Sequence, residues 1–539
     1  MPLHLRRPVL STAPWRWLGL LLLAAWLAGC ASLPPPGERP VSTALADPQD
    51  TRLGQLVLAR QAADGAHHPS GFRLLVNAQL AYAGRLALIE AAQQTLDLQY
   101  YAIHADSSTE RLLEAMRDAA RRGVRIRILL DDFNTVGPDA QVLRLAHEPG
   151  VQIRLFNPLP GSRHSLVGRV LGSLGEISRL QQRMHNKLFI ADNAIGITGG
   201  RNLGDTYFGE SADSNFVDVD VLAAGAIVRD LSASFDSYWN NQLAYPVQAL
   251  VSRAELDALQ ATEPATPAAP PPPASATATV LPDTAPAADP LAARLELQKI
   301  TLTWAPAIML ADKPDKIAAA DEEADREDTL VDGLLNLMAQ ARRDLLIISP
   351  YFVPGSRMMA LFADLRARGV RIRVLTNSLA SNDAPAAHVG YARYRTALLR
   401  MGVELYEMRS ELPNPHRAFG SSGSGAGSSS RAMLHAKLLI QDTRLLVVGS
   451  MNLDLRSQLQ NTEIALLIRS PAMARDTAAL IEPHLLDSAY RVELRPDGGL
   501  LWHAPLGSGA PDTTHEPDTS LGLRLMLRLI APFAPDELL

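Results

Sequence analysis

The order of apolar and polar positions divides the first half of the chain into short strands and a helix. Residues 95–103 (TLDLQYYAI) have strand character, and residues 109–123 (TERLLEAMRDAARRG) have a helical pattern. Residues 124–132 (VRIRILLDD) are typical of a second strand that is buried. The pattern predicts a strand–helix–strand unit.

The second half repeats this unit. Residues 343–353 (RDLLIISPYFV) have strand character, residues 356–369 (SRMMALFADLRARG) are helical in pattern, and residues 370–378 (VRIRVLTNS) form another strand. The hexapeptide RGVRIR occurs in both units, beginning at Arg122 and at Arg368. Two similar bodies are therefore predicted, and a chain of 539 residues is long enough to bury two cores.

A further phrase is also written twice, as RMHNKLFIADN at residues 183–193 and MLHAKLLIQDT at residues 433–443. RGVRIR begins 63 residues before His185 and 67 residues before His435, so the spacing is nearly constant. Chance matching does not explain that regularity. The sequence indicates an internal duplication of strand–helix–strand units, with a period too long for a solenoid.

The first copy of this phrase predicts a strand with two basic side chains on one face. His185 and Lys187 are two apart in a run of strand character, so both are expected to project from the same face. Leu188 and Ile190 are expected to face the core, and Asp192 begins a turn to the partner strand of a hairpin. The second copy has the same pattern at His435, Lys437, Leu438, Ile440 and Asp442.

Each copy continues to a glycine that is followed three residues later by an asparagine. The spacing after the aspartate is identical, with Gly199 and Asn202 in the first copy and Gly449 and Asn452 in the second. One His-x-Lys pair on a strand is most often part of a solvated surface. Two copies with one spacing, each followed by G-x-x-N, predict a shared functional site.

The paired histidines, lysines and asparagines suit the chemistry of a phosphodiester. They form no Cys/His cluster with zinc spacing, and lysine is a poor metal ligand, so no metal and no other cofactor is expected. Lysine and amide donors can hold the non-bridging oxygens while charge builds on phosphorus. One histidine can form a phosphohistidine while the other protonates the leaving alcohol and then deprotonates the incoming one.

A nucleophilic imidazole also needs an acceptor for its other nitrogen. In the second half Glu463 (in NTEIALLI) is the candidate. In the first half the candidate is Asp218 (in FVDVDVLA), with Asp220 as its close competitor. The alternative for each carboxylate is a buried pair with an arginine.

The segments HNKLFIADNAIGITGGRN and HAKLLIQDTRLLVVGSMN resemble the paired HxKxxxxD motifs of the phospholipase D superfamily. QYYAIHADSS, ISPYFVPG and GAIVRDLSASFDSYWN are also similar to family segments, and the resemblance covers nearly all of residues 71–502. The combination of MHNK, GGRNLGDTYF and HVGYARYR with an N-terminal lipoprotein motif is most similar to the bacterial cardiolipin synthases of the class C kind.

The resemblance implies an α/β fold of two phospholipase D-like lobes, with one active site at their interface. The two histidines would be nucleophile and general acid/base, in an order that stays open, and the carboxylates would hold them. The aspartate of each motif would orient its hairpin. The implied catalytic set is His185, Lys187, Asp192, His435, Lys437, Asp442, Asp218 and Glu463.

The lysines and a separate polar set would bind the phosphoryl oxygens. This set is Asn202, Asn452 and Ser450. The family's serine after the glycine is Ser450 in the second copy but Gly200 in the first. Any contact from a hydroxyl to phosphate is therefore expected only from the C-terminal side.

Four functions compete. A lipid transferase ranks first, a phospholipase D that hydrolyses phospholipids second, a nuclease of the same superfamily third, and a non-catalytic scaffold last. Both motifs are intact, which argues against the scaffold. The net charge of −6 gives no basic excess to meet a polyanion, so no nucleic acid is expected as partner. Phospholipids are the expected partners, and whether a helper protein takes part stays open.

The N-terminus predicts export and a lipid anchor. Residues 17–28 (WLGLLLLAAWLA) rise about 18 Å as a helix, too short for a bilayer core of about 30 Å, so they indicate a signal segment. Residues 27–30 (LAGC) resemble a bacterial lipobox, which implies acylation of Cys30; the alternative is a secretory signal with a chance cysteine. Ala31 is not the aspartate of the inner-membrane sorting pattern, so the periplasmic face of the outer membrane is the expected location.

Pro-, Ala- and Gly-rich stretches set the expected boundaries. The predicted order is a signal peptide (1–29), a lipidated Pro-rich tether (30–70), an N-terminal lobe (71–250), a Pro/Ala-rich linker (251–300), a C-terminal lobe (301–510) and a tail (511–539).

Two basic and apolar stretches are candidates for membrane contact. Residues 161–183 carry four arginines against one glutamate and run directly into His185, which favours contact with a membrane at the mouth of the site. In residues 520–533, Arg524 and Arg528 lie four apart among leucines. For this second stretch we expect a packed helix with solvated arginines.

Overall fold

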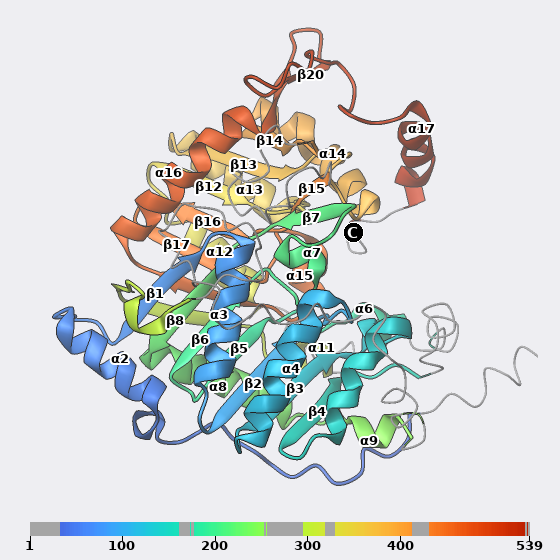
Figure 1. Ribbon diagram of the computed structural model, residues 1–539. Coiled ribbons are helices and arrows are strands. Elements are labelled where there is room, and N and C mark those ends of the chain that lie inside the picture. Colours follow the sequence, from blue (N-terminus) through green and yellow to red (C-terminus); the bar gives the residue numbers. More distant parts are fainter. Residues whose placement is uncertain are drawn as a thin grey trace, which may run out of the picture.

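The computed structural model describes residues 33–160, 177–252, 295–318, 329–411 and 431–533, together with residues 173, 255 and 536. These residues form two α/β lobes, each built on a nine-stranded sheet (Figure 1). In Figure 1 the N-terminal lobe lies below, mostly in blue to green, and the C-terminal lobe lies above, mostly in yellow to red. The predicted fold class is confirmed.

The first sheet has a parallel centre of three strands, extended on both sides by antiparallel neighbours. From edge to edge its strands are β10 (Thr303–Trp304), β1 (Ser70–Leu75), β8 (Asp220–Gly225), β6 (Ile195–Gly199), β5 (Leu188–Ala191), β2 (Thr95–Tyr100), β3 (Arg125–Asp131), β4 (Val151–Phe156) and β9 (Ala244–Pro246).

The second sheet repeats this plan. Its strands are β11 (Ala307–Ala311), β18 (Ile464–Ile468), β17 (Leu445–Gly449), β16 (Leu438–Gln441), β12 (Asp344–Ile348), β13 (Arg371–Asn377), β14 (Glu404–Met408), β19 (Ala489–Leu494) and β20 (Leu500–His503). The run β8-β6-β5-β2-β3-β4 corresponds to β18-β17-β16-β12-β13-β14 in order and direction. The predicted duplication is therefore visible strand by strand.

One face of each sheet is covered by helices of its own lobe. These are α3 (Ala78–Ala91), α4 (Ser107–Arg121) and the 3-10 helix η3 (Gly137–His147) in the first lobe, and α12 (Leu330–Met338), α13 (Gly355–Ala367) and α14 (Pro385–Arg400) in the second. Asp106 starts α4 by accepting a hydrogen bond from the backbone of Thr109. The helices predicted at residues 109–123 and 356–369 are α4 and α13.

The other faces of the two sheets share a single apolar core. Leu188 and Ile190 of β5 belong to the same buried cluster as Leu438 and Ile440 of β16, together with α8 (Ala226–Trp239) and α16 (Pro471–Asp487). The prediction that these leucines and isoleucines face a core is confirmed. Each such side chain contributes about 1.5–3 kcal/mol when it is fully buried. The core therefore holds the lobes against each other.

A short ribbon also joins the lobes. Strand β7 (Ser214–Val217) of the first lobe pairs in parallel with β15 (Arg431–Leu434) of the second, apart from the two large sheets. Figure 1 shows β7 in green reaching up to β15. The ribbon ends directly beside the candidate site.

Two predicted boundaries are wrong. The tether does not extend to residue 70, because Arg39 donates to the backbone of Gln242 and helix α2 (Arg52–Ala63) buries Leu53 and Val57 in the first core. These two residues are four apart and form a helical face that the Pro-rich composition before them conceals. The first sheet also takes its edge strand β10 from beyond the predicted linker, so the second lobe begins at β11.

Several predictions fall outside the described residues. They concern the signal segment, Cys30, most of the linker, and the larger part of the basic stretch 161–183, including Arg163 and Arg169. Among the described residues, no helix has both the length and the apolar character needed to cross a membrane.

Candidate active site

The two His-x-Lys pairs lie just before equivalent strands. His185 and Lys187 precede β5, and His435 and Lys437 lie between β15 and β16. The prediction that these pairs lie within a strand is wrong, because regular pairing of β5 and β16 begins only at the following leucine. Backbone groups in front of the strands pair instead with the opposite lobe.

Pairing across the lobes sets the register of both histidines. In the ribbon, Leu434 lies opposite Val217, so the next residues, His435 and Asp218, come side by side. The backbone amide of His435 donates to the carbonyl of Val217 at 2.8 Å. A parallel bridge between Met184 and Thr462 does the same for the residues that follow them, His185 and Glu463.

Each histidine is held by a carboxylate from the other lobe. Nδ1 of His185 lies 2.9 Å from both carboxylate oxygens of Glu463, and Nδ1 of His435 lies 2.6 Å from Asp218. Both carboxylates are fully buried. Asp220, the competing candidate, pairs with Arg85 at 3.0 Å instead. The four predicted residues thus meet at one place, and their partners are crossed between the lobes.

The surroundings of the two carboxylates differ. Ser450 and Ser457 donate hydroxyl hydrogen bonds to Glu463 at 2.5 and 3.0 Å. At Gly200, the counterpart of Ser450, a side-chain carbon would lie 2.3 Å from a carboxylate oxygen of Asp218. The shorter carboxylate and the missing side chain therefore depend on each other. Because the Ser450 hydroxyl is directed at Glu463, its predicted contact with phosphate stays a prediction.

Both lysines are buried beside the histidines. Nζ of Lys187 donates to the carbonyl of His185 at 2.8 Å, and Nζ of Lys437 donates to the carbonyl of His435 at 2.5 Å. Burial lowers the pKa of Lys187 to about 7, and it lowers the pKa of Lys437 as well. These ammonium groups are poorly satisfied without a ligand, so an anion that enters the site stabilises their charged form.

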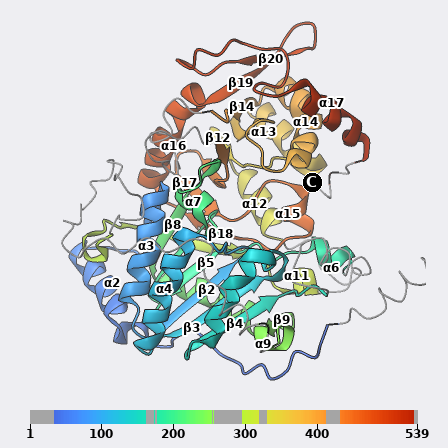
Figure 2. The same cartoon turned by 45° about the vertical axis from the view of Figure 1, so that its right-hand side comes forward.

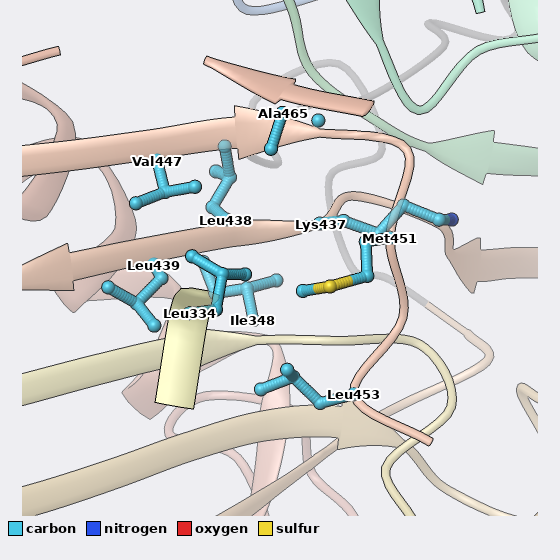
Figure 3. Close-up of a pocket in the computed structure, with 10 residues that line it drawn as sticks. Leu334, Ile348, Lys437, Leu438, Leu439, Val447, Met451, Leu453 and Ala465 are labelled. Carbon is cyan, nitrogen blue, oxygen red and sulfur yellow. The ribbon is translucent and has the colours of Figure 1, made fainter. Parts of the chain in front are cut away.

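Apolar packing explains why Lys437 is so well shielded. Its stem lies at the edge of an interior cavity of about 20 Å³, which has room for about one water molecule. Figure 3 shows Met451, Leu453 and Leu334 around this cavity and the ammonium group pointing away from it. The cavity is therefore part of the core behind the lysine and is too small to receive a substrate.

The charge state of the two histidine pairs differs. Burial, together with the nearby lysines, lowers the pKa of His185 well below its usual value, and burial and Lys437 lower that of His435. Burial raises the pKa of Glu463 to about 7. Burial alone would raise the pKa of Asp218 too, but His435 and Lys437 outweigh it and lower that pKa. Asp218 is thus ionised where Glu463 is half protonated.

The two predicted asparagines are buried at matching positions after β6 and β17. Asn202 donates to the hydroxyl of Tyr207 at 2.9 Å. The side-chain oxygen of Asn452 is buried, and the structure gives it no hydrogen-bond partner among the described residues. A buried carboxamide with unmet hydrogen-bonding capacity suits a site that holds a polar ligand. Its contact with phosphate stays a prediction.

The motif aspartates lie away from the histidines. Asp192 follows β5 and accepts hydrogen bonds from the backbone of Gln94 and Thr95 at 2.8 and 2.9 Å. Asp442 does the same for Arg343 and Asp344. Roughly 13 Å of strand separates each aspartate from its histidine. Their inclusion in the catalytic set is therefore wrong, whereas the expected structural role in the hairpin agrees with these bonds.

The sequence analysis missed two polar residues that position the histidines. Asp131, the last residue of β3, accepts from the backbone of Met184 at 2.9 Å. Asn377, the last residue of β13, holds Leu434 through two hydrogen bonds of 2.8 and 2.9 Å. Both side chains end the duplicated VRIR strands, and that shared position was the available signal.

Aromatic rings wall the histidines and were missed as well. Tyr101 meets the ring of His185 edge-on, with centroids 5.2 Å apart. Tyr207 and Phe216 approach the ring of His435 at 5.4 and 4.7 Å. These contacts fix the imidazole planes and help to exclude water.

Comparison with known proteins matches both lobes to one family. The family model described as "Cardiolipin synthase, PLD-like domain" matches residues 86–239 and 334–484, one range in each lobe. The chain is 36% identical to cardiolipin synthase C of Escherichia coli over 83% of this chain and 92% of that protein. It is 30% identical to an uncharacterised protein of Helicobacter pylori, over 94% of this chain and 97% of that protein.

One solved structure shares the two-lobed fold. The crystal structure of phosphatidylserine synthase from Haemophilus influenzae matches with a TM-score of 0.53 at 13% identity. The match covers 89% of this chain and 99% of that one, so it includes both lobes. At this identity the likeness concerns the fold alone.

Proposed function

The chain belongs to the phospholipase D superfamily, and we propose that it is a phosphatidyltransferase that makes a cardiolipin-type lipid by phosphodiester exchange. The observation that carries the proposal is the crossed pair of buried imidazoles. Each is held at Nδ1 by a carboxylate of the opposite lobe, which leaves Nε2 of each ring for the substrate. The relative named cardiolipin synthase C supports the lipid product.

In the first step, Nε2 of one neutral histidine attacks the phosphorus of a phospholipid. The new N–P bond forms as the P–O bond to the headgroup alcohol breaks, and the second histidine gives its proton to the departing oxygen. Lys187 and Lys437 hold the non-bridging oxygens, where negative charge builds up. The lowered pKa values of both histidines favour the neutral, nucleophilic form of the attacking ring.

In the second step, the alcohol of another lipid enters. The second histidine, now neutral, takes the proton of this alcohol as its oxygen attacks phosphorus, and the N–P bond breaks. One phosphodiester is thereby exchanged for another, so no external energy source is needed. If water entered instead of the alcohol, the product would be phosphatidic acid, and the protein would be a hydrolase.

Product analysis tests the proposal directly. Purified protein is incubated with vesicles of single phospholipids and of defined pairs, in water enriched in ¹⁸O, and the products are identified by mass spectrometry. We expect a lipid with two phosphatidyl groups, together with the released headgroup alcohol. ¹⁸O-labelled phosphatidic acid as the main product would contradict the transferase and favour the hydrolase.

We also propose an envelope location for this activity. Acylation of Cys30, as the lipobox resemblance implies, would hold the enzyme at the periplasmic face of the outer membrane, where its lipid substrates lie. Metabolic labelling with palmitate should mark the wild-type protein and not Cys30→Ala. An unlabelled wild type contradicts the anchor without affecting the proposed chemistry.

A further inference from the structure

The C-terminal tail contains a helix with an unusual distribution of apolar side chains. Helix α17 (Leu521–Ile530) starts where the Ser520 side chain accepts from the backbone of Leu523. Only Leu527 is buried, against Leu379 and Val389, with Leu523 half-buried beside it. The predicted helix is present, but the expectation that its leucines are packed is wrong for most of them.

The face of α17 that points away from the protein is apolar. Leu521, Leu525 and Leu529 are spaced by four residues, and 64%, 50% and 74% of their surfaces are exposed. Met526 and Ile530 extend this face. Five of the twelve exposed large apolar side chains in the described chain thus lie on ten residues. Such a continuous patch on a surface marks a binding face.

Anchors on both sides of α17 hold the helix in place. Before it, Glu516 pairs with Arg395 at 2.8 Å. After it, Asp536 pairs with Arg393 and Tyr394 at 2.5 Å each. The exposure of the leucines is therefore a fixed feature of the fold rather than a result of a loose tail.

The patch lies on the C-terminal lobe near the candidate site. Helix α17 packs on α14 and on Leu379, as Figure 2 also shows for the two helices. Leu379 follows two residues after Asn377, which holds the backbone next to His435. A short stretch of chain thus connects the patch to the catalytic histidine.

We propose that α17 docks the enzyme on a lipid bilayer, with its outer leucines among the acyl chains. Arg524 and Arg528 border this face, and α17 contains no acidic residue, so its charge complements anionic headgroups. The assignment of a lipid surface rests on the proposed function, because a phospholipid substrate requires the site to approach a bilayer. A second protein or a second copy of this chain is the alternative occupant.

A local probe tests the docking in the full chain. In a Cys30→Ser background, a bimane fluorophore is attached at Leu525→Cys or at the control Leu486→Cys. Leu486 is a 52% exposed leucine of α16, on the other side of the lobe in Figure 1. The vesicles contain equal parts of phosphatidylglycerol and phosphatidylethanolamine with a nitroxide on the acyl chains. We expect quenching at position 525 and little at 486. Equal quenching at both positions, or none at 525, overturns the proposal.

Activity provides a second and separable readout. Leu521→Ser/Leu525→Ser/Leu529→Ser should lower kcat/KM on vesicles by at least about tenfold. Turnover of a short-chain phosphatidylglycerol, monomeric in solution, should not change, and Leu480→Ser/Leu486→Ser should behave as the wild type. Equal loss on both substrates contradicts docking. If the wild type turns over no phospholipid but position 525 is quenched, the proposed function fails and the docking stands.

Discussion

The His185–Glu463 and His435–Asp218 pairs are built on the same cross-lobe register but differ around the carboxylate. Glu463 receives two serine hydroxyls and has its pKa raised by burial to about 7. Asp218 is shorter, stands where Gly200 leaves room, and has its pKa lowered by His435 and Lys437. The duplication has preserved the geometry of the two histidines and changed their proton affinity. That difference is what a nucleophile and an acid/base require of two otherwise equal rings.

The largest effect is expected at the rings themselves. His185→Ala and His435→Ala should each lower kcat by about 10³-fold or more, because each removes a step that the other ring cannot perform. Circular dichroism should show an unchanged fold. Acid quenching with a ³²P-labelled lipid then assigns the roles, because only the variant that keeps the nucleophile can retain label. A variant with more than a few per cent of wild-type activity contradicts a shared site.

Removing the negative charge of each carboxylate should separate the two pairs. At pH 7, Asp218→Asn should lower kcat by about 10³-fold and Glu463→Gln by about tenfold, because Glu463 is already half protonated there. As pH rises through about 7, Glu463 becomes ionised, so kcat/KM of the wild type should rise over that range. Equal losses in the two variants, or a pH profile that is flat near 7, would show that the pairs do not differ.

A smaller effect is expected from the residues that distinguish the two carboxylates. Gly200→Ser places a side-chain carbon 2.3 Å from Asp218 and must displace that carboxylate, so kcat should fall by about tenfold or more. Ser450→Ala removes one hydrogen bond to Glu463 and should lower kcat only several-fold. Steady-state kinetics on a soluble diester measures both, and a harmless Gly200→Ser would sink the steric explanation.

The smallest effect on activity is expected at the motif aspartates. Asp192→Asn and Asp442→Asn should leave kcat nearly unchanged and lower the free energy of unfolding by about 1–3 kcal/mol through weaker bonds to backbone amides. Asp192 is fully buried and Asp442 is not, so the first substitution should cost more. Urea denaturation measures this difference. A large loss of kcat without loss of stability would return these residues to the catalytic set.

The duplicated strands and helices could be predicted because their signals are local. RGVRIR and the two His-x-Lys phrases repeat within a few dozen residues of each other, and their periodicity identifies β3, α4 and their counterparts. Asp218 and Glu463 could be named for their chemistry, but not paired. Their partners are set by the β7–β15 ribbon and the Met184–Thr462 bridge, which join residues more than 200 positions apart. A pattern along one segment does not contain such a register.

The same limit explains the errors at the edges of the lobes. Residues 33–63 contain proline and polar side chains that are typical of a tether, yet Leu53 and Val57 complete the first core once the lobe offers them a surface. Thr303 and Trp304 become an edge strand only because β1 leaves an edge to pair with. Tertiary contacts decide both cases.

The apolar core shared by the two sheets has a consequence for how the chain is made. During synthesis the first half leaves the ribosome with Leu188, Ile190 and Val221 on a face that has no cover until residues of β16 to β18 follow. The nascent half therefore exposes a sticky surface for the time needed to add more than 200 residues. Completion of the second half would close that surface, so the finished protein should melt in a single cooperative calorimetric transition.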